Sequence, residues 1–187
     1  MPKINGNEIR PGNILEHNDG LWNVVKVEHV KPGKGGAFAQ VEMRNLRNQS
    51  KLNERFRSAD RVERVRLEQR DHQFLYRDGE LLVLMDTEQF DQVSLDSSLL
   101  GERLPFLQEG MTVLVEFHGE EALKVTLPQK VACRVDETEP VISGQTAANS
   151  FKPAVLDNGV RISVPPFIGV GDDVMVNTET FAYSERA

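Results

Sequence analysis

The chain has 187 residues, of which 39% are hydrophobic and 27% charged, the composition of a soluble globular protein. Its single cysteine, Cys133, excludes an intramolecular disulfide and a zinc site built from several thiolates. The N-terminus lacks the apolar core of a signal peptide, and the longest strongly apolar run, residues 81–85, is far too short to cross a bilayer. We therefore expect a cytoplasmic protein without membrane contact.

The net charge of -7 argues at first against a nucleic-acid partner. The charge is unevenly distributed, however. Residues 1–64 carry a net charge of +4, residues 65–128 a net charge of -8 and residues 129–187 a net charge of -3. The basic first third could face phosphates while the acidic middle discourages wrong docking. Chance unevenness explains the distribution equally well.

Eight segments have the composition of β-strands, and the longer ones place β-branched or apolar residues at alternate positions, the period of two that is typical of strands. They are residues 21–30, 37–46, 51–56, 81–85, 112–117, 122–127, 131–135 and 160–164. Dipeptides between them favour tight hairpins, because a two-residue hairpin turn needs positive φ at its centre. These dipeptides are Asp19-Gly20, Asp78-Gly79, His118-Gly119 and Asn158-Gly159.

One short helix is expected between Asp96 and Gln108, where four leucines fit one face. Pro105 lies near the middle of this segment and disfavours a continuous α-helix.

Many short strands at spacings of roughly 8–12 residues indicate small barrels or sandwiches. We place one domain boundary near residue 64, where the charge balance changes sign, and another at Pro128, where a strand ends. The sequence therefore predicts an all-β protein of three small β-barrel domains. These domains are residues 1–64, 65–128 and 129–187.

The segment that joins the first two long strands is the most informative part of the chain. It presents one lysine, Lys34, between glycines and after a proline. Proline stiffens one arm of the loop, and glycines permit sharp turns and close approach to a partner. The loop residues around Lys34 are Lys31, Pro32, Gly33, Gly35 and Gly36.

The residues of this loop leave three interpretations open. Lys34 could be an ordinary solvated side chain, or part of a loop that grips phosphate, or a lysine presented to a deep pocket of a partner. The phosphate-binding interpretation fits poorly, because the spacing differs from G-x-x-x-x-G-K-[ST] and a strand follows the loop.

The stretch VKPGKGGAFAQVEMRNL resembles the first domain of bacterial elongation factor P, whose loop has the form K-P-G-K-G-x-A-F. A second segment fits the C-terminal signature of that family, K-x-A-x4-G-x2-[LIV]-x-V-P-x2-[LIV]-x2-G. The matching residues are Lys152, Ala154, Gly159, Ile162, Val164, Pro165, Ile168 and Gly171. The resemblance covers essentially the whole chain.

The resemblance implies an SH3-like, KOW-like barrel followed by two OB-fold barrels in an elongated L shape. It implies a factor that binds the ribosome between the peptidyl and exit sites and relieves stalling at consecutive prolines. Lys34 would contact the end of peptidyl-tRNA, and a lysine-modifying enzyme would lengthen it. The expected partners are ribosomal RNA, peptidyl-tRNA and messenger RNA in the exit site, and the expected form is a monomer.

Several basic residues are candidates for RNA backbone contacts, because lysine and arginine neutralise phosphate. They are Arg10, Lys26, Lys31, Arg44, Arg55 and Arg57. The family also has a G-D-T-A loop that approaches messenger RNA, and the matching residues here are Gly144, Gln145, Thr146 and Ala147. Gln145 lacks the family's acidic charge, so a charge-dependent role is in doubt and a plain turn is the alternative.

The C-terminus resembles the family's tyrosine and arginine ending through Tyr183 and Arg186. Tyr183 could instead pack on its own barrel. The alternative to a translation factor is a general RNA-binding OB-fold protein or RNA chaperone, which would show exposed aromatic residues for base stacking. No spacing of histidines, acids or Cys133 suggests a catalytic or metal site, so we expect neither an enzyme nor a cofactor.

Overall fold

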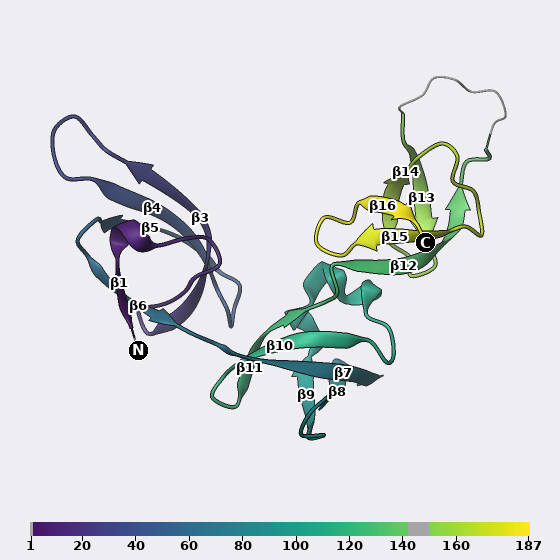
Figure 1. Cartoon of the computed structure of the whole chain (residues 1–187), viewed down its shortest axis with the longest axis horizontal. Helices are drawn as coiled ribbons and strands as arrows, with labels where there is room; N and C mark the ends of the chain where they lie inside the picture. Colours follow the sequence, from purple (N-terminus) through teal and green to yellow (C-terminus); the bar gives the residue numbers. More distant parts are fainter. Residues whose placement is uncertain (1, 142–149) are drawn as a thin grey trace. The chain divides into compact units, whose positions relative to one another are not determined.

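A computed structural model describes residues 2–141 and 150–187, and almost all of its regular structure is β-strand, arranged in three antiparallel sheets along the chain (Figure 1). The predicted all-β class is confirmed. The chain forms two compact units, residues 1–69 with 116–124 and residues 70–115 with 125–187. The predicted domain boundaries at residues 64 and 128 stay predictions. None of the helices in the described ranges is long and apolar enough to cross a membrane.

The first sheet has six strands and belongs to the first unit. Its strands, in spatial order, are β1 (Lys3–Asn5), β6 (Arg61–Val65), β2 (Ile14–His17), β3 (Gly20–Val30), β4 (Phe38–Asn45) and β5 (Lys51–Arg57). A 3-10 turn, η1 (Gly6–Glu8), follows β1. The longest hairpin is formed by β3 and β4, and its last pair is Val30 opposite Phe38.

The core of this sheet lies on one side of β3, β4 and β5, because alternate strand residues point to opposite faces. Ala39, Val41 and Met43 of β4 are fully buried, together with Val24 of β3. The residues between them on β4 are less buried and form the outer face. The sheet therefore has one apolar face and one face that is available to a partner.

The second sheet has five strands. In spatial order they are β11 (Glu121–Thr126), β10 (Thr112–His118), β7 (Glu68–Asp78), β8 (Leu81–Asp86) and β9 (Gln92–Asp96). The tip of the β10–β11 hairpin belongs to the first unit. There Leu123 joins a buried cluster with Ile14, Leu21 and Val65 of the first sheet and with Leu46, which follows β4.

The helix expected between residues 96 and 108 is two 3-10 turns, η2 (Ser97–Leu99) and η3 (Gly101–Phe106). Gly101 has a φ of +55°, which ends any right-handed helix at that residue. Pro105 lies inside η3 and lacks the N–H that an α-helix would need. These two residues explain why no continuous α-helix forms.

The third sheet has five strands and lies in the second unit. In spatial order they are β14 (Arg161–Val164), β13 (Lys152–Leu156), β12 (Lys130–Thr138), β15 (Asp173–Asn177) and β16 (Tyr183–Arg186). Val131, Cys133 and Val135 alternate on the buried face of β12. Burial, with a smaller contribution from Asp157, raises the pKa of the Cys133 thiol to about 11, so this thiol is a core side chain rather than a nucleophile.

The hairpin turns follow the dipeptides with one shift of register. Gly79, Gly119 and Gly159 all have positive φ, as the predicted turns require. In the β2–β3 hairpin, His17 pairs with Gly20, so Asn18 and Asp19 form the turn with φ values of 50° and 59°. The turn therefore lies one residue before the expected Asp19-Gly20, because asparagine and aspartate tolerate the left-handed conformation.

Candidate functional site

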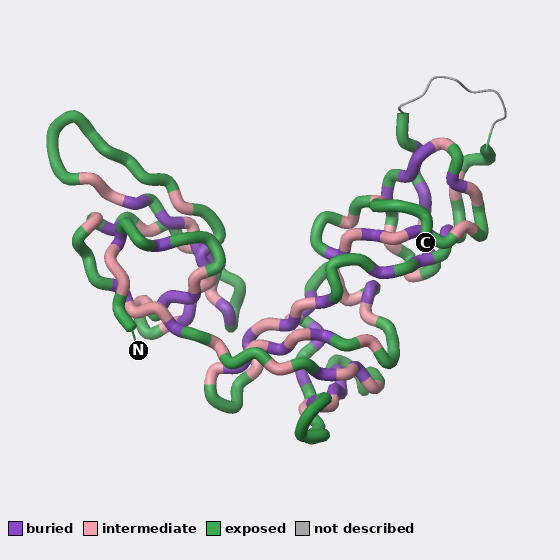
Figure 2. Tube along the Cα trace, viewed as in Figure 1, coloured by how far each residue is buried: buried purple, intermediate pink, exposed green. Residues whose placement is uncertain are grey.

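The loop between β3 and β4 extends from the first sheet and is exposed from Lys31 to Gly36 (Figure 2). Gly35 has a φ of +111°, which side chains with a Cβ rarely adopt. An added Cβ at Gly33 or Gly36 would meet nothing within 4 Å, and neither residue has positive φ. The backbone conformation at Gly35 therefore favours glycine. Gly33 and Gly36 have ordinary conformations and leave open space beside Lys34.

The Lys34 side chain is exposed and makes no hydrogen bond or ion pair with any residue that the structure describes. Its neighbours in the loop carry no acidic group. No part of the described fold therefore competes with a partner for its ammonium group.

The base of the loop, by contrast, is held by contacts with β5 and the turn after it. The Ala37 carbonyl accepts hydrogen bonds from the Ser58 backbone N–H at 3.2 Å and from the Ser58 hydroxyl at 3.0 Å. The Arg55 guanidinium carbon lies 4.2 Å from the centroid of the Phe38 ring, within the range of a cation–π contact. The loop is thus anchored at its base and unrestrained at its tip.

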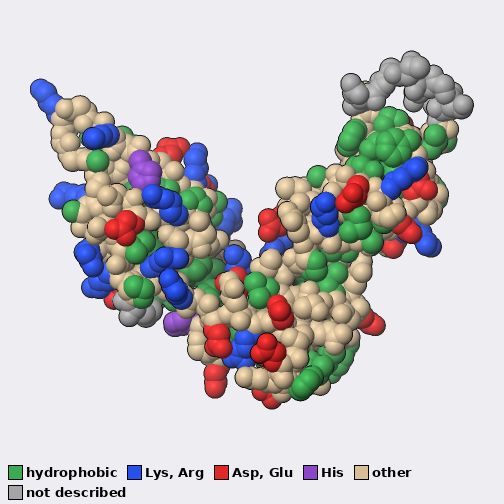
Figure 3. Space-filling model, in the orientation of Figure 1, with side chains coloured by type: hydrophobic (Ala, Val, Ile, Leu, Met, Phe, Trp, Pro, Cys, Tyr) green, Lys and Arg blue, Asp and Glu red, His purple; other side chains and the backbone are tan. Residues whose placement is uncertain are grey.

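The outer face beneath the loop collects basic side chains from three strands. Arg57 lies opposite Phe38, Arg55 opposite Gln40, and Lys51 opposite Arg44. Residues that are opposite each other share a face, and Lys26 joins this face opposite Glu42. We call this surface the basic face; its cations are Lys26, Arg44, Lys51, Arg55 and Arg57. Figure 3 shows Lys and Arg side chains gathered over this part of the molecule.

Two of these cations are already paired with acids on the same face. Lys26 Nζ lies 3.0 Å from Glu28, and this hydrogen bond raises the pKa of Lys26. Lys51 is paired with Glu42, and the hydrogen bond from Lys51 lowers the pKa of the Glu42 carboxyl.

Arg44, Arg55 and Arg57 differ from those two, because they make no ion pair with any described residue. They are the cations of the basic face that remain open to phosphate.

The structure therefore brings together four of the predicted RNA contacts, namely Lys26, Arg44, Arg55 and Arg57. Arg10 lies apart from them, because its guanidinium donates to the carbonyls of Asn7 and Ile9 at 3.1 and 3.0 Å and so closes its own turn.

Three residues of the site were not predicted from the sequence. Lys51 shares the basic face only through its register with Arg44. Phe38 and Ser58 support the loop through contacts across strands and turns. The family's loop form K-P-G-K-G-x-A-F ends in a phenylalanine that matches Phe38 and could have indicated it. No local pattern indicated Ser58.

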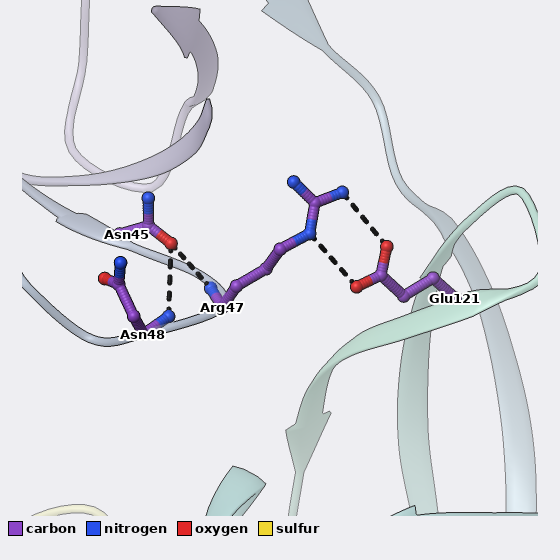
Figure 4. Close-up of polar contacts among 4 residues, drawn as sticks. All are labelled: Asn45, Arg47, Asn48 and Glu121. Carbon is purple, nitrogen blue, oxygen red and sulfur yellow. Dashed lines mark hydrogen bonds and ion pairs between the residues drawn. The ribbon is translucent and has the colours of Figure 1, made fainter. Parts of the chain in front are cut away.

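The far end of β4 is tied to the β10–β11 hairpin within the first unit. Arg47 donates from Nε and Nη2 to the two carboxylate oxygens of Glu121 at 3.1 and 3.0 Å (Figure 4). The Asn45 side-chain oxygen accepts from the backbone N–H groups of Arg47 and Asn48, which fixes the turn that presents the arginine. The Arg47 guanidinium lowers the pKa of the Glu121 carboxyl.

The predicted contacts at the C-terminus have partners within the third sheet's own unit. Arg186 Nη2 donates to the Phe167 carbonyl at 3.2 Å and lies 3.6 Å from Asp172. The Tyr183 and Phe151 rings meet edge to face with centroids 6.4 Å apart. Gly144, Gln145, Thr146 and Ala147 lie outside the described residues.

No three His, Cys, Asp or Glu side chains in the described ranges lie close enough to hold a metal ion. What the described residues do present at this site is an exposed lysine and, on the same sheet, a cationic surface.

Three family models match the chain in succession. Residues 5–62 match the elongation factor P (EF-P) KOW-like domain, residues 67–125 the elongation factor P (EF-P) OB domain, and residues 131–186 the elongation factor P C-terminal domain.

Curated relatives named elongation factor P match over essentially the full length. The protein of Jannaschia sp. (strain CCS1) is 73% identical over 187 residues, which are 100% of both chains. The protein of Brucella abortus (strain S19) is 57% identical over 185 residues, which are 99% of this chain and 100% of that one. The similarity thus includes all three sheets.

A solved structure, eukaryotic translation initiation factor 5A from Methanococcus jannaschii, resembles the fold with a TM-score of 0.55 at 22% identity. The match covers 68% of this chain and 92% of that chain. At this identity the resemblance concerns the fold alone.

Proposed function

The chain belongs to the elongation factor P family of translation factors, and from that premise we propose that it binds the ribosome between the peptidyl and exit sites. There it stimulates peptide-bond formation that has stalled at consecutive prolines. Lys34 is the residue that reaches the peptidyl-transferase centre, and its loop residues Lys31, Pro32, Gly33, Gly35 and Gly36 carry it there.

The observation that supports this proposal best is the contrast between the tip and the base of the loop. Lys34 has no competing partner in the described chain, whereas Ala37 and Phe38 are held by Ser58 and Arg55. A side chain presented in this way suits contact with a distant pocket, and a modifying enzyme could also reach it.

The proposed chemistry is positioning, without an acid or base supplied by the protein. Proline is a poor partner in peptide-bond formation because its ring restricts the chain. Correct orientation of reactants contributes roughly 7–11 kcal/mol in favourable cases. A rescue of about 100-fold needs only about 2.7 kcal/mol, so ordering of the peptidyl-tRNA end by Lys34 is sufficient.

The basic face supplies the proposed contact with ribosomal or transfer RNA. Arg44, Arg55 and Arg57 would neutralise phosphates, with Lys26 and Lys51 contributing less because they already have acidic partners. Messenger RNA would meet residues 144–147, and Tyr183 and Arg186 remain candidates near the C-terminus. We propose a monomer that acts in the cytoplasm and is not itself an enzyme.

The direct test replaces Lys34 and measures synthesis through a proline run in a reconstituted translation system. We expect Lys34→Ala to remove rescue and to leave the unfolding temperature unchanged, because Lys34 has no contact to lose. Lys3→Ala, another exposed lysine of the first unit, is the matched control and should rescue normally. Full rescue by Lys34→Ala would rule out this mechanism.

A further inference from the structure

A five-residue turn with one hydrogen-bond pattern recurs in all three sheets. Its first residue is Asn or Asp, and the side-chain oxygen of that residue accepts from the backbone N–H groups two and three residues later, as in an Asx turn. Its fifth residue has positive φ and donates its backbone N–H to the carbonyl of the first. We call this element the capped turn; its copies are residues 45–49, 86–90 and 177–181.

Two copies of the capped turn bind another segment of the chain. In the first copy, Arg47 forms the paired hydrogen bonds with Glu121 of the β10–β11 hairpin (Figure 4). In the third copy, the ring of Phe181 lies 5.5 Å from the ring of Phe106 in η3, centroid to centroid. Each contact lies within one compact unit. The capped turn is therefore an element that this fold uses for docking.

The second copy lies between β8 and β9 and presents its fifth residue to solvent. Phe90 is 68% exposed, and its ring makes no ring contact or cation–π contact with any residue that the structure describes. Its φ is +64°, a conformation that is unfavourable for a bulky side chain. Backbone strain of this kind is retained where the surrounding structure enforces it, and it often marks a functional site.

The backbone of this second copy is held from beneath, so the position of Phe90 does not depend on its own side chain. Asp86, which caps the turn, is only 3% exposed, and its other carboxylate oxygen lies 3.5 Å from the Arg70 guanidinium. Thr87 donates from its backbone N–H and its hydroxyl to the Asp71 carbonyl at 3.1 and 3.2 Å. An anchored turn presents the ring with little ordering cost, which favours binding.

The charge around Phe90 indicates the class of partner. Glu88 and Asp91 lie beside it along the chain, Asp71 supports the turn, and all three are exposed. Residues 65–128 as a whole carry a net charge of -8. Such a surface repels the phosphates of RNA and attracts a basic protein. An aromatic side chain at the centre of a protein interface fills an apolar pocket of the partner.

We propose that the capped turn at residues 86–90 is a protein-docking site, in which Phe90 inserts into an apolar pocket rimmed by lysine or arginine on a protein of the ribosome. The location of the partner rests on the proposed function, which puts the chain on the ribosome. The first and third copies are the precedent, because they already bind protein groups through side chains that the turn projects.

Ribosome affinity of Phe90 variants tests the contact, with the full chain and purified ribosomes. We expect Phe90→Ala to weaken binding by about tenfold, because truncation of an aromatic anchor is among the costliest changes at an interface. Phe90→Gly should weaken binding equally and should not lower the unfolding temperature, because glycine adopts positive φ without strain. A residue with only a structural role would lower affinity and stability together.

Tyr76→Ala is the matched control, because Tyr76 is a half-exposed aromatic residue of the same sheet that lies outside the turn. This variant should bind like the parent chain, and a loss as large as that of Phe90→Ala would overturn the docking site. Normal binding by both Phe90 variants would also overturn it and would leave the proposed function intact. Failure of the parent chain itself to bind ribosomes would overturn both.

Charge and crosslinking distinguish a protein partner from RNA. Glu88→Gln and Asp91→Asn should each weaken binding to a pocket rimmed by cations, whereas both changes would strengthen binding to phosphate. A chain that carries p-benzoyl-L-phenylalanine at position 90 should crosslink on irradiation to a ribosomal protein, in a product that resists ribonuclease. Tighter binding by the neutralised variants, a crosslink to ribosomal RNA, or no crosslink from a chain that binds would each overturn the proposal.

Discussion

Lys34 differs from the exposed cations beneath it in what surrounds its charge. Lys26 and Lys51 have acidic neighbours, and Arg55 rests on the Phe38 ring. Lys34 has neither an acidic partner nor a ring contact among the described residues. Its ammonium group can therefore bind a partner without first breaking a contact within the chain. The backbone around it, rather than other side chains, decides where it points, and Gly35 is the residue on which that backbone depends.

We predict that Gly35→Ala reduces rescue of proline runs and that Gly33→Ala does not. A Cβ at the Gly35 conformation costs about 1–2 kcal/mol, equivalent to about 5- to 30-fold in the population of the correct loop conformation. Gly33 has no positive φ and open space around it, so alanine is tolerated there. Initial rates of synthesis through the proline run measure the difference. Equal rates for both variants would show that the Gly35 conformation is not needed.

At the scale of elements, the β3–β4–β5 sheet converts alternating sequence into two faces with different tasks. Its inner face buries Val41 and Met43, and its outer face carries the basic face. β4 connects the loop to the rest of the unit, since the loop precedes its first residue and the Arg47 turn follows its last.

We predict that Arg44→Gln weakens ribosome binding and lowers its salt dependence, whereas Lys26→Gln has a smaller effect. Each phosphate contact contributes about 0.7–0.9 to the slope of log K against log salt. Lys26 must first give up Glu28, so its net contribution is less. Ribosome affinity measured over a range of salt concentrations tests this. A steeper loss for Lys26→Gln than for Arg44→Gln would contradict the assignment of the open cations.

At the scale of the whole molecule, the chain does not divide into units in simple sequence order. The tip of the β10–β11 hairpin, residues 116–124, groups with the first sheet. Leu123 fills an apolar cluster there, and Glu121 forms the ion pair with Arg47. The first unit is thus completed by a segment that residues 70–115 separate from it along the chain, and its stability should depend on that segment.

We predict that Leu123→Ala destabilises the first unit by about 2–4 kcal/mol, the usual cost of truncating a buried leucine. Trp22 is the only tryptophan of the chain and lies in β3, so its fluorescence reports on this unit. The denaturation midpoint seen by Trp22 should fall for Leu123→Ala. Val176→Ala in the third sheet is the control and should leave the Trp22 transition nearly unchanged. The reverse pattern would show that the hairpin does not support the first sheet.

The Arg47–Glu121 pair predicts a dependence on pH. Because the folded state lowers the pKa of Glu121 below its ordinary value of 4.5, the pair stabilises the fold above that value. Its contribution is lost as the pH falls through the lowered pKa. Both side chains are about half exposed, so we expect only about 0.2–1 kcal/mol.

Thermal unfolding of Glu121→Gln measures this contribution. The variant should melt at a lower temperature than the parent chain at neutral pH and at the same temperature once the Glu121 carboxyl of the parent chain is protonated. A difference that persists in acid would point to packing rather than charge.

Expectations from local pattern were right where a strand alternates, as in β3 and β4, and where it is a short apolar run, as in β8. No strand was predicted at β1, β2, β6, β7, β9, β13, β15 or β16. In β6 (RVERV) and β16 (YSER), charged residues interrupt the alternation. These strands are stabilised by pairing with β2 and β15, which are neighbours in space. Such pairing energy depends on distant residues and leaves no mark in a local window.

The sequence by itself determined the all-β class, the hairpin loop with Lys34 at its tip and the family resemblance. All of these depend on residues close together along the chain, through strand period and turn conformation. The tertiary structure decided which cations share a face, which of them acids neutralise, and how Phe151 and Tyr183 meet. Those properties depend on strand register and on contacts between distant segments, because a shift of one residue in register would turn every side chain of a strand to the other face.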